Sequence, residues 1–137
     1  MVSQTISYLG TLRCSVIHGP SGVQFVTDAP TDNHGRGQSF SPTDLVVTAL
    51  ATCIVTTMGI RAQGDGVSLD GSTVFIEKHM STDPPRRISR IALRIEIAAG
   101  ISASYRLILE HTARTCPVAQ SIHPGIESEL SFHYDKT

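Results

Sequence analysis

Hydrophobic and polar positions in the first third of the chain predict a β-hairpin followed by a long loop. In residues 6–18, apolar side chains recur at even spacing, which predicts a strand with one buried face: Ile6, Tyr8, Leu12, Cys14 and Val16. The turn sequence of residues 19–22, GPSG, separates it from a second strand over residues 23–27, so we expect an antiparallel pair. Residues 28–40 are rich in Asp, Asn, Gly and Pro and predict an irregular loop, a kind of segment that is often functional.

Residues 41–61, SPTDLVVTALATCIVTTMGIR, predict a long central helix. Ser41 suits the N-cap and Pro42 the first helical position, where a missing N–H costs nothing. Asp44 falls in the first turn, where a carboxylate meets the positive end of the helix dipole. Residues 45–60 carry no charge, so we expect a helix that is buried nearly all round. The run is short and rich in threonine for a membrane span of about 20 apolar residues, and we expect no membrane insertion.

The second half of the chain predicts two strands, a helix, a short turn and a final strand. The strands cover residues 72–80 and 88–97, and the second alternates, with Ile91, Leu93, Ile95 and Ile97 on one face. Ser102 is expected to cap a helix that ends near Thr115, followed by a short turn over residues 117–121. Residues 126–134 alternate again and predict the last strand. The pattern indicates one α+β domain over residues 1–137.

Composition narrows the class of protein. Charged residues make up 17% of the 137 residues, below the usual fraction of about 25%, which indicates that a partner subunit covers part of the surface. The net charge of −1 gives no field to attract nucleic acid or an anionic membrane. The N-terminal residues lack a basic segment followed by an apolar one, so we expect no signal peptide. Three cysteines do not make a secreted disulfide framework, and we expect a cytoplasmic protein.

Cys53 and Cys116 are the candidate reactive groups. A thiol reacts as its thiolate, which is favoured near a cation or at a helix N-terminus. Cys116 precedes Pro117 and so falls at the N-cap of the predicted turn, whereas Cys53 lies in mid-helix and would need a neighbouring Arg or His. The alternative is that either cysteine only packs, since free cysteines are often buried; for Cys14, on the apolar face of a strand, we expect that structural role. No CxxC or HxxxH spacing is present, so we expect neither a metal nor a cofactor.

The segment SPTDLVVTALATC, in which Pro42 precedes a small-residue helix that carries Cys53, resembles the OsmC/Ohr family. The segment TCPVAQSI around Cys116 is similar to the second cysteine element of that family, and the two cysteines lie 63 positions apart, as the family's pair does. The likeness extends from the first hairpin to the last strand.

The resemblance implies an OsmC-like fold of antiparallel strands, a long buried central helix and a second helix, in an intertwined homodimer with active sites at the subunit interface. It also implies a thiol peroxidase that reduces organic hydroperoxides. Cys53 would attack the peroxide and become a sulfenic acid, and Cys116 would resolve it as a disulfide. An external dithiol, in many members a lipoylated protein, would then reduce that disulfide.

Two positions depart from the family's pattern. Peroxidatic members activate the first cysteine with an arginine from the hairpin turn and a glutamate directly after the helix proline; here Pro20 and Thr43 stand at those places. Arg36 and Arg13 are substitutes by position, and Asp44 is a further candidate, although its place in the first turn favours a role toward the helix dipole.

Two hypotheses follow from the sequence. The first is a hydroperoxide reductase with an apolar interface pocket lined by Val47, Leu50, Ile54 and Met58. The second is a non-catalytic or redox-sensing OsmC-like dimer that binds an unknown small ligand. The intact cysteine pair favours the first, and the missing Arg and Glu favour the second.

Overall fold

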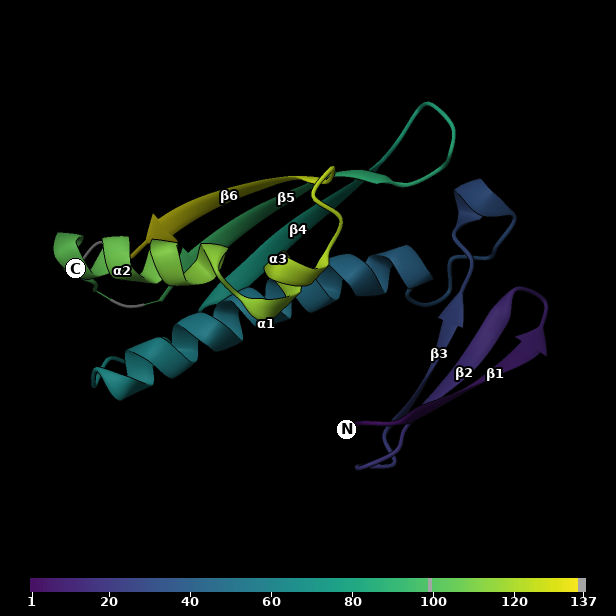
Figure 1. The fold of residues 1–137 in the computed structure, drawn as a ribbon, viewed down its shortest axis with the longest axis horizontal. Coiled ribbons are helices and arrows are strands. Elements are labelled where there is room, and N and C mark those ends of the chain that lie inside the picture. Colours follow the sequence, from purple (N-terminus) through teal and green to yellow (C-terminus); the bar gives the residue numbers. More distant parts are fainter. Residues whose placement is uncertain (99, 136–137) are drawn as a thin grey trace. The chain divides into compact units, whose positions relative to one another are not determined.

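The computed structural model describes residues 1–98 and 100–135, and this part of the chain contains six strands, three α-helices and one 3₁₀ helix (Figure 1). They divide between two compact units, Met1–Val46 and Val47–Thr137, which are described separately below. The mixture of helices and strands confirms the predicted α+β class. In chain order the elements are β1 (Gln4–Gly10), β2 (Arg13–His18), β3 (Gln24–Asp28), η1 (Thr31–Asn33), α1 (Pro42–Gly64), β4 (Thr73–Met80), β5 (Ile88–Ile97), α2 (Ala103–Arg114), α3 (Pro117–Ser121) and β6 (Glu127–Tyr134).

The first unit contains an antiparallel sheet in the order β1-β2-β3. The prediction of one strand over residues 6–18 is wrong, because a tight turn separates β1 from β2. In this turn Gly10, Thr11 and Leu12 have φ values of 78°, 53° and 64°, a region that glycine adopts readily and other residues rarely. The alternation of apolar residues runs through the turn unbroken, since partners such as Tyr8 and Cys14 share a face of the sheet. Periodicity alone therefore could not reveal the break.

One face of this sheet is apolar and largely uncovered. Ile6, Val16 and Phe25 are cross-strand neighbours on it. Val16 is buried, but Ile6 is 60% exposed and its neighbour Tyr8 is 67% exposed. A three-stranded sheet that leaves its apolar face open gains little stability by itself.

The start of α1 has the predicted cap. The Ser41 hydroxyl accepts a hydrogen bond from the Asp44 N–H at 3.1 Å, and the Ser41 N–H donates to Asp44 Oδ2 at 2.8 Å. This reciprocal pair is a capping box, with Asp in the position more often held by Glu. Pro42 is the first helical residue, as predicted.

Only one side of α1 is buried within the single chain, so the predicted burial nearly all round, which depends on a partner subunit, stays a prediction. The buried residues repeat every three or four positions and form one stripe: Val47, Leu50, Ala51, Ile54, Met58 and Ala62. On the other side Thr52 and Thr56 are exposed, and Ile60 is 68% exposed. Small and apolar residues on both sides hide this asymmetry in the sequence.

Helix α1 is also longer than the apolar run that predicted it. Its 23 residues, with a mean hydropathy of 1.7 over the most apolar window, are long and apolar enough to cross a membrane. The argument from length against a membrane span therefore fails. The packing of its buried stripe against a sheet is that of a core helix in a globular protein.

The second unit is built on a sheet in the order β4-β5-β6 (Figure 1). Strands β4 and β5 are antiparallel, as predicted, but β6 runs parallel to β5. A parallel neighbour requires a long crossover, and here α2 and α3 supply it. The expectation of antiparallel strands alone is therefore corrected to a mixed sheet.

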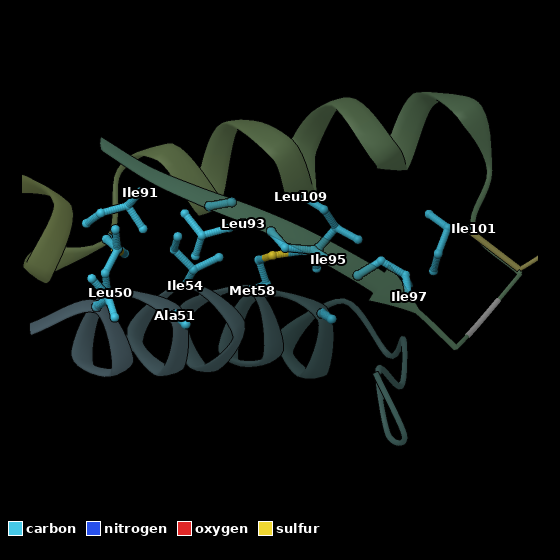
Figure 2. Packing of buried hydrophobic residues seen from close by; sticks show 14 of the residues in the cluster. Leu50, Ala51, Ile54, Met58, Ile91, Leu93, Ile95, Ile97, Ile101 and Leu109 are labelled. Carbon is cyan, nitrogen blue, oxygen red and sulfur yellow. The ribbon is translucent and has the colours of Figure 1, made fainter. Parts of the chain in front are cut away.

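The core lies on one face of this sheet. From Ile91 to Ile97 the odd-numbered residues of β5 point to this face and pack with the buried stripe of α1 and with Leu109 of α2 (Figure 2). Charged residues at even positions lie on the opposite face, where Arg90 binds Glu129 and Arg94 binds Glu96. The alternation predicted for residues 88–97 is thus confirmed.

Candidate functional site

Cys53 lies in the middle of α1, next to the buried stripe. Its side chain is partly buried and packs against the core that includes Leu50 and Ile54. Its Sγ lies 4.0 Å from the hydroxyl oxygen of Thr57, which follows one helical turn later. Because Cys53 is far from the helix N-terminus, the backbone N–H groups around it are bound within the helix and cannot contact the sulfur.

Cys116 is the N-cap of α3, as the Cys-Pro sequence predicted. Pro117 holds the first helical position, and the backbone of Cys116 is extended. Its Sγ accepts a hydrogen bond from the Ala119 N–H at 3.4 Å. The side chain is fully buried, at 0% exposure. The local sequence explains this position, since α2 ends at Arg114 and the chain must turn before Pro117.

The two cysteines lie near enough for Cys53 to influence the ionisation of Cys116. Burial is the main cause that raises the pKa of the Cys116 thiol, and the neighbouring Cys53 raises it further, against the lowering effect of the Ala119 N–H. Both cysteines are free thiols. Cys116 therefore stays protonated beside Cys53, and the less buried Cys53 sulfur is the one open to a reagent.

Arg13 is engaged within the first unit. It pairs with Asp28 at 3.3 Å and also donates to the Gln38 side chain. Asp28 is buried and accepts a hydrogen bond from the Gln38 N–H at 2.9 Å. That backbone hydrogen bond, followed by the interaction with Arg13 and a smaller contribution from Arg36, holds the pKa of Asp28 below its usual value, against the opposing effect of burial. The cluster fixes the loop after β3 to the sheet.

The other candidate activating residues have local roles of their own. Asp44 caps α1 through Ser41, as its position in the first turn indicated. Thr43, at the place of the family glutamate, contacts the Ser41 hydroxyl at 3.2 Å. Both residues belong to the first unit, and the two cysteines belong to the second.

A pocket of about 520 Å³ lies between α1, the C-terminal end of α2, α3 and the start of β6. Of the four residues expected to line an interface pocket, Leu50 and Ile54 line this pocket within the chain, and all four belong to the core cluster. Its remaining lining is both apolar and polar: Ala113, Arg114, Ala119, Gln120, Ile122, His123, Pro124, Ile126, Ser128 and Leu130. Within residues 1–98 and 100–135, no group of three or more His, Cys, Asp or Glu side chains is placed to hold a metal ion.

Sequence reasoning missed two members of these clusters. Asp28 is the buried partner of Arg13, and the only signal for it is a carboxylate at the end of a strand, which is usually solvated. Thr57 is four positions after Cys53, a spacing that places two side chains on the same face of a helix.

Comparison with known proteins identifies the family. A model of the OsmC-like protein family matches residues 35–131. A solved structure from Psychrobacter arcticus, named for an osmotic stress induced and detoxification response, is 41% identical over 97% of this chain and 96% of its own, with a TM-score of 0.92.

More distant structures share the fold alone. The organic hydroperoxide resistance protein OsmC of Legionella pneumophila is 18% identical over 97% of this chain and 96% of its own, with a TM-score of 0.78. The organic hydroperoxide resistance protein OhrB of Bacillus subtilis is 15% identical over 96% of this chain and 97% of its own, with a TM-score of 0.71. No curated protein matches the sequence. Because the family model covers well over half of the chain, this protein belongs to the OsmC-like family.

Proposed function

We propose that this protein is a thiol-dependent peroxidase that reduces organic hydroperoxides, with Cys53 as the attacking thiol and Cys116 as the resolving thiol. The observation that supports the proposal is that two free thiols 63 positions apart in the sequence lie near enough for one to influence the pKa of the other. Structural packing alone requires no second cysteine beside the first, whereas a sulfenic acid next to a thiol condenses to a disulfide.

The difference in environment between the two sulfurs assigns the two steps. In the first, the Cys53 thiolate attacks one oxygen of the hydroperoxide, a sulfur–oxygen bond forms and the O–O bond breaks. The alkoxide that leaves takes a proton and departs as the alcohol. Cys116, which burial keeps protonated, does not compete for the peroxide.

In the second step the Cys116 sulfur attacks the sulfenic sulfur of Cys53. The disulfide bond forms as hydroxide leaves, and the proton of Cys116 converts this hydroxide to water. An external dithiol then supplies two electrons and two protons, which restores both thiols and leaves the reductant as its own disulfide. A small, soluble dithiol or a lipoylated protein carries the right chemistry for this step.

The names of related proteins support the same reaction. Two structures that share this fold are named organic hydroperoxide resistance proteins, and the relative at 41% identity is named for a detoxification response. The pocket beside α1 and α3 includes the apolar side chains of Leu50 and Ile54, which lie close in sequence to Cys53, although neither cysteine lines it.

The residue that activates Cys53 stays a prediction from sequence position, with Arg13 and Arg36 as candidates. Within the first unit, Arg13 is bound by Asp28. Asp44 acts as the cap of α1 and is the weakest of the three candidates. We propose a cytoplasmic location, where a dithiol reductant would be present to recycle the protein.

We also propose that the chain works as a homodimer. The exposed apolar face of the β1-β2-β3 sheet and the exposed side of α1 are surfaces that a second copy would cover. An obligate interface of this kind buries more than about 2,000 Å² in total. Sedimentation at micromolar concentration would give a dimer; a folded monomer would contradict this part of the proposal.

A second function is favoured by the missing activating pair. Thr43 replaces the family glutamate and Arg13 is bound by Asp28, so a redox-sensing dimer that oxidises without turning over is the competing function. Such a protein would form the Cys53–Cys116 disulfide slowly and would bind a small ligand in the 520 Å³ pocket.

Thiol counting after peroxide addition separates the two functions. One equivalent of cumene hydroperoxide should remove two thiols per chain, at a rate well above that of free cysteine. Cys53→Ser should abolish this loss, Cys116→Ser should leave a trappable sulfenic acid, and Cys14→Ser should behave as the parent. Oxidation no faster than that of free cysteine would exclude the peroxidase.

A further inference from the structure

Threonine hydroxyls on the helices differ in what they contact. Thr52 Oγ1 donates to the Thr48 carbonyl at 2.9 Å, and Thr112 Oγ1 donates to the Ile108 carbonyl at 2.8 Å. This backbone bond one turn earlier is the usual arrangement for threonine in a helix. The Thr57 hydroxyl instead lies 4.0 Å from the Cys53 sulfur, its hydrogen-bond partner among the described residues.

The Cys53 sulfur has few donors around it. In the part of the chain that the structure describes, its hydrogen-bond partner is Thr57, and Cys116 lies near enough to interact electrostatically. A thiol is a weak hydrogen-bond donor, and Cys116 gives up its proton in the second step of the proposed reaction. The backbone around residue 53 offers no free N–H, because α1 uses these groups within the helix. Among residues 1–98 and 100–135, Thr57 is therefore the residue whose hydroxyl lies within hydrogen-bond distance of this sulfur.

We propose that Thr57 is a positioning residue for Cys53, whose O–H donates to the ionised sulfur and fixes the direction in which that sulfur points. The inference rests on the proposed function for the reaction, although it concerns a property of the thiol that is measurable without peroxide. A hydrogen bond to the charged form of a group favours that form. Thr57 and Cys53 are both partly buried, so water competes only in part for this hydrogen bond.

The test compares three substitutions on α1. Thr57→Val keeps the branched shape and removes the hydroxyl, Thr57→Ser keeps the hydroxyl, and Thr52→Val removes an exposed hydroxyl that bonds only to the backbone. Alkylation of Cys53 by iodoacetamide is followed as a function of pH, with the Cys53 peptide quantified by mass spectrometry. Circular dichroism and a melting curve show whether each variant is folded. If Thr57→Val does not fold, Thr57→Ala takes its place.

We expect Thr57→Val to slow alkylation of Cys53 at neutral pH by about threefold and to move its pH profile upward by about half a unit. Thr57→Ser should restore the parent profile, and Thr52→Val should leave it unchanged. An unchanged profile in Thr57→Val, or a Ser variant as slow as the Val variant, would overturn the proposal.

Two readouts keep this proposal distinct from the peroxidase proposal. If the alkylation profile depends on Thr57 but cumene hydroperoxide is not reduced, the positioning role stands and the peroxidase fails. If Thr57→Val keeps the parent alkylation profile and the parent rate with peroxide, the positioning role fails and the peroxidase stands.

Discussion

Alkylation of Cys116 in the folded protein should be at least about tenfold slower than in the chain unfolded by urea. Burial is the largest cause of its raised pKa, and its side chain is 0% exposed. Because its pKa is raised, a smaller fraction of Cys116 is thiolate at neutral pH than in the unfolded chain, and this accounts for part of the difference in rate. The remaining factor comes from access, because a reagent must wait for local opening.

The substitution Cys53→Ser separates the two causes of the raised pKa of Cys116, which are burial and the neighbouring Cys53. It removes the sulfur whose hydrogen bond and charge raise the pKa of Cys116, but it leaves the burial intact. We therefore expect Cys116 in this variant to react no more than about threefold faster than in the parent, and still well below the unfolded rate.

The assay is competition between light and heavy iodoacetamide, with native and urea pulses at the same pH and the Cys116 peptide read by mass spectrometry. Cys14→Ser, in the other unit, serves as the matched control. A Cys116 that reacts at the unfolded rate in the native parent would refute the burial argument. If Cys116 reacted at the unfolded rate in the folded Cys53→Ser variant, Cys53 and not burial would be the main cause of the slow alkylation.

Three further predictions concern stability. Leu109→Ala should lower the free energy of unfolding by about 3 to 4 kcal/mol in urea denaturation, since this side chain is fully buried between helix and sheet; a loss below about 1 kcal/mol would mean that the site collapses. Asp28→Asn should destabilise the chain at neutral pH but not in strong acid. The pKa of Asp28 is lower in the folded chain than its ordinary value of 3.8, so the ionised carboxylate stabilises the fold fully above pH 3.8. This stabilisation is lost as the pH falls through the pKa of the folded chain. Acid titration of both proteins by circular dichroism tests this, and parallel curves would contradict it. Tyr134→Phe should cost about 1 kcal/mol, because its hydroxyl donates to Glu110 at 2.9 Å; thermal melts that match the parent would show that this bond contributes nothing.

Local patterns in the sequence predicted the local structure well. The alternation in residues 88–97 predicts which side chains of β5 face the core. The helix caps at Ser41, Ser102 and Cys116 lie where the side-chain chemistry of these residues indicated. Each of these features depends on a few neighbouring residues, so a single sequence contains enough information to find it.

Features that depend on distant residues could not be predicted in this way. The turn at Gly10 interrupts a strand without breaking its period, and β6 lies parallel to β5 because of how α2 and α3 return the chain. The pairing of Arg13 with buried Asp28 links two strands, and no spacing rule indicates it. That the two thiols lie near each other was expected from the family resemblance alone, since nothing in the spacing requires it.

The parallel β6 has a consequence for the order in which the chain folds. Strands β4 and β5 are neighbours in sequence and pair locally, whereas Arg90 of β5 pairs with Glu127 of β6 only after both intervening helices have folded back. Contacts between distant residues form slowly, so we expect β6 to dock late. Until it does, the edge of β5 that later binds β6 has unpaired backbone N–H and C=O groups, which can pair with another chain. We therefore expect aggregation to begin at this edge when folding is slowed before β6 docks.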